Sequence, residues 1–165
     1  MARITRRGVA VTTIGELPEV GSRAPEFELV SADLGRVSSS EFAGRRVLLN
    51  IFPSIDTGVC AASVRRFNQE VAGMENTTVV GVSKDLPFAH SRFCEAEGIE
   101  NMVTASAFRS SFGEDYGVTM LDGELEGLLA RSVVVIDPDG TVTYTEQVPE
   151  IGQEPDYEAA LAALR

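Results

Sequence analysis

Residues 47–60 read VLLNIFPSIDTGVC and carry the clearest structural pattern of the chain. The first six residues of this stretch form an apolar run interrupted only by Asn50, which is typical of a strand buried on both faces of a sheet. Apolar residues then recur at spacings of four, three, four and three, which predicts one face of a helix. The members of that face are Cys60, Val64, Phe67, Val71 and Met74. A cysteine is therefore expected in the first turn of a helix that follows a buried strand.

The segments around this stretch predict an α/β fold with a mixed central sheet. A second buried strand is expected at 78–82, then a helix at 86–97 capped by Asp85 and ended by Gly98, and a weaker strand at 102–108. Strand–helix–strand units pair in parallel. A hairpin at 132–148, which turns at 137–140, adds antiparallel strands, and a last helix begins at Pro155. We expect helices on both faces of this sheet.

The remaining N-terminal segments carry weaker patterns. Residues 3–13 alternate around Arg7-Gly8, which predicts a small β-hairpin, while 27–30 is a short strand candidate and 38–42 a turn of helix. The chain has 165 residues, so we expect a single domain over residues 1–165.

The composition excludes several classes of partner. The net charge is −11, from 25 acidic and 14 basic residues, which argues against binding nucleic acid or an anionic membrane. The sequence has no apolar run near the ~20 residues that span a bilayer, and no apolar stretch follows the basic N-terminus. The expected compartment is therefore the cytoplasm. Two cysteines and one histidine are too few for a four-ligand zinc site without carboxylates.

Cys60 has the surroundings of a reactive thiol. A helix N-terminus and nearby positive charge lower a thiol pKa from ~8.5 into the range ~3.5–7.5. Thr57 lies one turn earlier, within reach of the sulfur, and Pro53 can limit access of water. The alternative is a core cysteine, because Cys60 shares the apolar face with Val64 and Phe67 and free cysteines are often buried. The proline, the threonine and the helix start favour the reactive interpretation.

The same residues carry a resemblance to a known family. Pro53, Thr57 and Cys60 match every fixed position of Pro-x-x-x-Thr-x-x-Cys, the active-site pattern of peroxiredoxins. The chain further resembles the thiol peroxidases, the atypical two-cysteine peroxiredoxins, along essentially its whole length. The matching stretches are VTTIG at 11–15, GSRAPEF at 21–27, NIFPSIDTGVC at 50–60, SKDLPFA at 83–89 and RFC at 92–94.

This resemblance implies a thioredoxin-like fold with an N-terminal β-hairpin extension. It also implies a thioredoxin-dependent peroxidase that reduces hydrogen peroxide and organic hydroperoxides in antioxidant defence and redox homeostasis. Cys60 would be the peroxidatic cysteine, which passes through a sulfenic acid, and Cys94 the resolving cysteine, which closes a Cys60–Cys94 disulfide. No metal, haem, flavin or nicotinamide is implied. The implied partners are thioredoxin and a second copy of the chain, in a homodimer paired through loops near the active site.

Three further residues are ambiguous from sequence alone. Cys94 lies beside the core stripe expected for its helix, so it is either an accessible thiol or a partly buried structural one. That stripe comprises Leu86, Ala89, Phe93 and Ala96. Arg131 would by resemblance point at the cysteine pocket, although an arginine before a buried strand is more often a flanking charge. His90 is expected to be a solvated surface residue without a catalytic role.

Rival functions remain open at this point. A thioredoxin-like disulfide exchanger normally carries Cys-x-x-Cys, but Ser63 stands at the second position. A glutathione-peroxidase-like enzyme normally uses a tryptophan, which the chain lacks. A redox sensor or binding module would react slowly with peroxide and keep a stable oxidised form.

Overall fold

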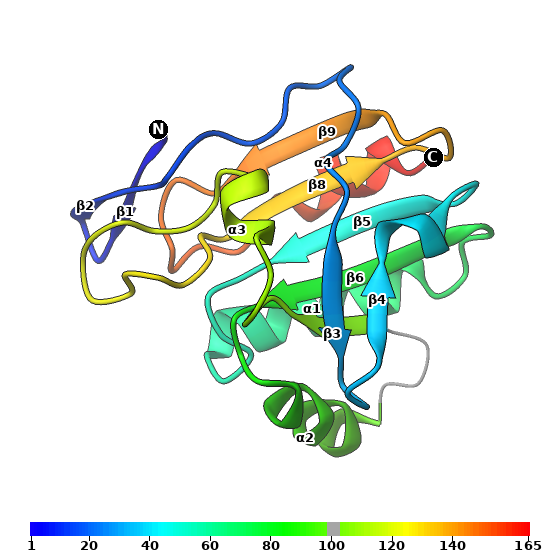
Figure 1. Cartoon of the computed structure of the whole chain (residues 1–165), viewed down its shortest axis with the longest axis horizontal. Helices are drawn as coiled ribbons and strands as arrows, with labels where there is room; N and C mark the ends of the chain where they lie inside the picture. Colours follow the sequence, from blue (N-terminus) through cyan, green and yellow to red (C-terminus); the bar gives the residue numbers. More distant parts are fainter. Residues whose placement is uncertain (99–102) are drawn as a thin grey trace.

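The computed structural model describes residues 1–98 and 103–165, and its centre is a seven-stranded sheet in the order β4-β3-β7-β6-β5-β8-β9 (Figure 1). The strands β5, β6 and β7 pair in parallel, whereas the other neighbours pair antiparallel. The mixed sheet predicted from the strand–helix–strand order is thus confirmed. The bounds are β3 (Glu28–Ser31), β4 (Arg36–Ser38), β5 (Arg46–Ile51), β6 (Thr77–Ser83), β7 (Val103–Ser106), β8 (Ser132–Ile136) and β9 (Val142–Gln147).

The expected N-terminal hairpin is also present. It comprises β1 (Arg3–Arg6) and β2 (Val9–Thr12), which form a separate two-stranded sheet. Its inner residues Ile4 and Val11 pack in a small cluster with Met120, Ala130 and Ile151. The hairpin therefore covers the segments that lead into and out of the β8–β9 pair.

Helices cover both faces of the main sheet (Figure 1). They are α1 (Gly58–Val71), α2 (Pro87–Glu97), α3 (Phe112–Asp115) and α4 (Tyr157–Ala163), with a 3-10 turn η1 (Ser39–Phe42). Neighbouring residues of β5 show the two faces, as expected from the alternation along a strand. Leu49 packs in the cluster of Phe112 from α3, whereas Leu48 packs with Phe67 from α1 and Leu161 from α4. In the part of the chain that the structure describes, no helix is long and apolar enough to cross a membrane.

Two short elements, β4 and α3, were not predicted from the sequence. β4 has three residues and α3 has four, too few for a periodic pattern to be visible. The strand expected at 102–108 is β7, and Met102 lies outside the described residues.

The two buried parallel strands end together, and the segment that leads to Cys60 leaves the sheet at this edge. Ile51 of β5 pairs with Val82 of β6, and the Phe52 amide donates to the Val82 carbonyl at 3.0 Å. The loop that follows β5 and the turn that follows β6 therefore meet at one edge of the sheet. In open α/β sheets this carboxyl edge is where reactive groups gather.

Candidate active site

Cys60 occupies the first turn of α1, as predicted. The first intrahelical bond runs from the Ala61 amide to the Thr57 carbonyl at 3.0 Å, so the amides of Gly58, Val59 and Cys60 have no partner one turn earlier. These amides and the helix dipole create a positive potential at this end of the helix. The Cys60 side chain is fully buried, in a cluster with Phe52, Ile55 and Val64 of its own segment and Ala89 and Phe93 of α2.

The Arg131 guanidinium lies against the sulfur. Arg131 is 2% exposed, and its Nη2 donates to Cys60 Sγ at 3.3 Å, while its Nε donates to the Ile151 carbonyl at 2.9 Å. Its Nη1 has no hydrogen-bond partner among the described residues, and no carboxylate among them forms an ion pair with it. The guanidinium of Arg131 thus points at the cysteine pocket, as the resemblance implied. Arg131 is not merely a charge that flanks a buried strand.

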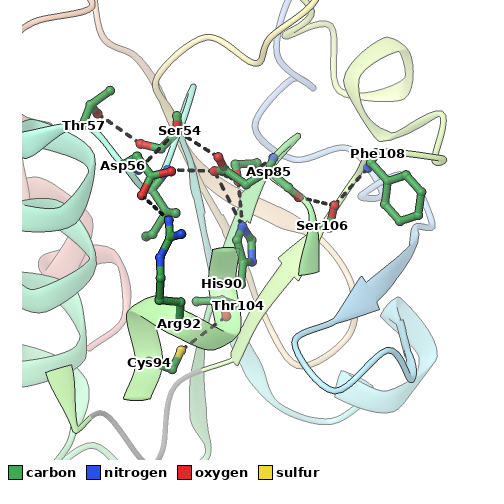
Figure 2. A network of polar contacts seen from close by, with 12 residues as sticks. Ser54, Asp56, Thr57, Asp85, His90, Arg92, Cys94, Thr104, Ser106 and Phe108 are labelled. Atoms are coloured by element: carbon green, nitrogen blue, oxygen red, sulfur yellow. Dashed lines mark hydrogen bonds and ion pairs between the residues drawn. The ribbon is translucent and has the colours of Figure 1, made fainter. Parts of the chain in front are cut away.

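Pro53 and Thr57 lie at the two ends of the loop 53–57, which leads from β5 to Cys60. Pro53 is buried, whereas Thr57 is exposed and forms the N-cap of α1. The Thr57 hydroxyl donates to the Ser54 carbonyl at 3.1 Å (Figure 2). Among the hydrogen bonds of the described residues, none joins this hydroxyl to Cys60 Sγ, so in this conformation Thr57 closes the loop instead of contacting the sulfur.

Cys94 is half-buried in α2 and faces the sheet. Its Sγ lies 3.5 Å from Thr104 Oγ1 of β7 (Figure 2). Cys60 and Cys94 are both free thiols. Phe93, its neighbour in sequence, packs against the Cys60 cluster together with Ala89. In this conformation the Cys94 sulfur contacts β7, whereas other side chains of α2 pack toward Cys60.

The expected core stripe of α2 is confirmed only at Ala89 and Phe93, which pack against the Cys60 cluster. Leu86 is 53% exposed and Ala96 is also exposed, whereas the buried residues of α2 are Pro87 and His90. α2 contacts the Cys60 cluster through one side and β7 through another, so its apolar residues do not form a single stripe.

His90 and Asp85 were also interpreted incorrectly from the sequence. His90 is fully buried, not solvated, and its Nε2 lies 2.8 Å from Ser83 Oγ. Asp85 does not cap α2, because the N-cap is Leu86. Its carboxylate instead accepts hydrogen bonds from Ser54 Oγ at 2.8 Å and from the Ile55 amide at 2.7 Å. The sequence feature that could have indicated this contact is the position of Asp85, two residues after the buried strand β6.

The hydrogen bonds at Asp85 affect its ionisation. Burial raises the pKa of Asp85, but hydrogen bonds with His90, Ser83, the Ile55 amide and Ser54 together lower it to about 2. Asp85 is therefore an anion at neutral pH.

The position of a second Cys-x-x-Cys cysteine is occupied by a structural hydroxyl. Ser63 is fully buried, and its Oγ donates to the Cys60 carbonyl at 2.8 Å and accepts from Asn50 Nδ2 at 3.2 Å. Within residues 1–98 and 103–165, no group of three or more His, Cys, Asp or Glu side chains could hold a metal ion.

A buried cysteine at a helix start, with an arginine on its sulfur and a mixed sheet beneath it, defines a thiol-dependent redox protein of thioredoxin-like fold. Residues 19–161 match the Redoxin family model. The chain is 65% identical to a thiol peroxidase of Mycobacterium tuberculosis and 60% identical to one of Corynebacterium glutamicum, in each case over 164 residues and 99% of both proteins.

Solved structures agree with this assignment. A peroxiredoxin-like protein from Aquifex aeolicus has a TM-score of 0.94 at 40% identity, covering 99% of this chain and 96% of that one. A thiol peroxidase from Chromobacterium violaceum, at 20% identity, shares the fold with a TM-score of 0.90, covering 98% of this chain and 94% of that one. The chain belongs to the Redoxin family and, within it, to the thiol peroxidases. The predicted thioredoxin-like fold is confirmed.

Proposed function

We propose that the protein reduces hydrogen peroxide and organic hydroperoxides through Cys60. The Cys60 thiolate attacks the terminal peroxide oxygen, the O–O bond breaks, and the sulfur becomes a sulfenic acid while water or an alcohol leaves. The observation that carries this proposal is the 3.3 Å contact between Arg131 Nη2 and Cys60 Sγ. A buried guanidinium that has no carboxylate partner among the described residues favours negative charge on the sulfur beside it.

The pocket also contains donors for the peroxide. Arg131 Nη1 is buried and unpartnered among the described residues, so it is available to a peroxide oxygen. The Cys60 amide, free in the first helical turn, is a second donor for the charge that develops on the leaving oxygen. We assign Thr57 to positioning the peroxide after its hydroxyl leaves the Ser54 carbonyl, and Pro53 to shielding the sulfur from water.

Cys94 then resolves the sulfenic acid. Its thiol condenses with Cys60 to form a disulfide and releases water, and a thioredoxin dithiol restores both thiols by exchange. The two Cα atoms must come within ~7 Å. Because Phe93 packs toward Cys60 while Cys94 faces Thr104, part of α2 or of the first turn of α1 must open in each cycle.

The protein would act in the cytoplasm as a homodimer. The exposed apolar side chains near the active-site edge support pairing through these loops. They are Leu86, Phe88 and Phe108, which are 53%, 67% and 40% exposed. Size-exclusion chromatography with light scattering measures the oligomeric state, and a monomer at micromolar concentration would refute this part.

One experiment tests the catalytic proposal. Reduced wild type and Cys94→Ser each receive one equivalent of peroxide, and free thiols are counted by mass spectrometry. We expect the wild type to lose both thiols and the variant to hold a single oxidised Cys60. If neither thiol reacts within minutes, Cys60 is a core cysteine and the proposal fails.

Turnover separates an enzyme from a redox sensor. With catalytic thioredoxin and its reductase, a peroxidase consumes many equivalents of peroxide. A sensor would give slow reaction and a persistent disulfide.

A further inference from the structure

Asp85 joins the active-site loop to the start of the helix that carries Cys94. One carboxylate oxygen accepts from Ser54 Oγ at 2.8 Å, and the other accepts from the Ile55 amide at 2.7 Å (Figure 2). Both donors belong to residues 53–57, which lead from β5 to Cys60. The Asp85 side chain is only 12% exposed, so water competes little for these bonds.

The other contacts of Asp85 hold the carboxylate to α2 and β6. Ser83 Oγ donates to Asp85 Oδ2 at 2.5 Å. Because that hydroxyl has one proton, the His90 Nε2 at 2.8 Å from it must be the donor in their hydrogen bond. The Asp85 carbonyl in turn accepts from Ser106 Oγ of β7. Asp85 is thus connected to β6, α2, β7 and the active-site loop.

The remaining polar link from this loop to α2 is weak. Arg92 Nη2 lies 3.0 Å from Asp56 Oδ1, but the two side chains are 70% and 62% exposed. Exposed ion pairs contribute little to stability, with values of about 0–1 kcal/mol. Hydrogen bonds to a shielded carboxylate are stronger than such pairs. Asp85 is therefore the main polar restraint on opening of the loop at this edge.

We propose that Asp85 is a positioning residue that holds the loop 53–57 closed over Cys60 and that its release is a step of disulfide formation. This inference rests on the proposed peroxidase cycle. In the closed state the pocket is intact for peroxide, whereas condensation with Cys94 needs the open state. The strength of the Asp85 contacts therefore sets the partition of the sulfenic acid between the disulfide and overoxidation to the sulfinic acid by a second peroxide.

The test compares Asp85→Asn with Asp137→Asn in the full chain. Asp137 is a matched control, because its carboxylate also accepts backbone amides in a turn after a buried strand, those of Asp139 and Thr141. Rapid acid quench and mass spectrometry follow the sulfenic, disulfide and sulfinic forms after a peroxide pulse. The same pulse in a Cys94→Ser background measures the first step alone.

We expect Asp85→Asn to form the disulfide about tenfold faster, which is a loss of about 1.4 kcal/mol of restraint. Its yield of sulfinic acid at high peroxide should fall, while the first step changes by less than about threefold. Asp137→Asn should leave the partition unchanged. Should Asp85→Asn fail to fold, Ser54→Ala removes one donor and should accelerate the disulfide by about threefold.

A normal first step with an unaltered rate of disulfide formation in Asp85→Asn would overturn the proposal and leave the peroxidase function intact. An equal change of partition in Asp137→Asn would also overturn it, because general destabilisation would then account for the effect. If the wild type forms no sulfenic acid, the proposed function fails first, and this outcome is recognisable without any Asp85 variant.

Discussion

Replacing Arg131 with methionine should separate the chemistry of the site from the stability of the fold. Methionine keeps much of the length and apolar stem of arginine but removes the charge and all donors. The lost bond to Cys60 Sγ, 3.3 Å in the structure, is one to a charged partner, and such bonds contribute about 1.5–3 kcal/mol. If that stabilisation is made in the transition state for attack by the sulfur, the rate of sulfenic acid formation should fall about 10- to 100-fold.

The stability of the same variant should hardly change. Arg131→Met leaves the Ile151 carbonyl without the Nε donor at 2.9 Å, which destabilises the fold by about 1 kcal/mol. It also removes a buried charge that has no carboxylate partner among the described residues, which is a gain. These two effects oppose each other, so we expect the free energy of unfolding to change by no more than about 1 kcal/mol.

The kinetic assay needs a protein in which Cys60 is the only cysteine. In a Cys94→Ser background, stopped-flow mixing with hydrogen peroxide and trapping of the sulfenic acid give the second-order rate constant. Urea unfolding is followed by circular dichroism, since the chain has no tryptophan. The exposed Arg109 supplies a control, Arg109→Met, which should alter neither quantity. An unchanged rate constant, or a loss of more than about 3 kcal/mol of stability, would show that Arg131 serves the fold and not the reaction.

Three further predictions concern other parts of the molecule. Cys94→Ser should lose thioredoxin-dependent turnover while still consuming one equivalent of peroxide per Cys60; sustained turnover would exclude Cys94 as the resolving cysteine. Since the folded-state pKa of Asp85 is about 2, below the ordinary 3.8, its stabilisation of about 2 kcal/mol should be present above pH 4 and lost as the pH falls toward 2. Urea unfolding of wild type and Asp85→Asn should therefore differ at pH 5 and converge near pH 2; a gap independent of pH would contradict this. Gly117→Ala should destabilise the fold by about 2–4 kcal/mol in the same assay, because Gly117 has φ of +69° and a Cβ would lie 2.3 Å from the Glu16 carbonyl oxygen; a change below about 1 kcal/mol would contradict this.

The parts predicted well from sequence are those determined by local patterns. β5 and α1 have long runs of one periodicity, so both were predicted closely, and the position of Cys60 at a helix start followed directly. Arg131 is 71 residues from Cys60 along the chain, and no spacing rule brings the two together. Only the resemblance to a family indicated that contact.

The errors concern side chains whose surroundings come from several elements. The burial of His90 depends on the turn after β6, and its Nε2 is paired with Ser83 from that strand, whereas its Nδ1 has no partner among the described residues. Phe88 and Phe108 are large apolar side chains, yet they are exposed at the active-site edge. Average preferences place phenylalanine in the core and histidine at intermediate burial, whereas the tertiary contacts decide each case.

The packing indicates why α2, and not the sheet, would open in the proposed cycle. In β5 and β6 most side chains are buried, in clusters that draw on many elements. The cluster around Cys60 has four buried members, and of the eleven residues in α2 only Pro87 and His90 are buried. Local opening is favoured where few apolar contacts are lost. The thiol is thus anchored on a rigid strand edge, while the helix carrying Cys94 is held largely by polar contacts that can be exchanged for water during disulfide formation.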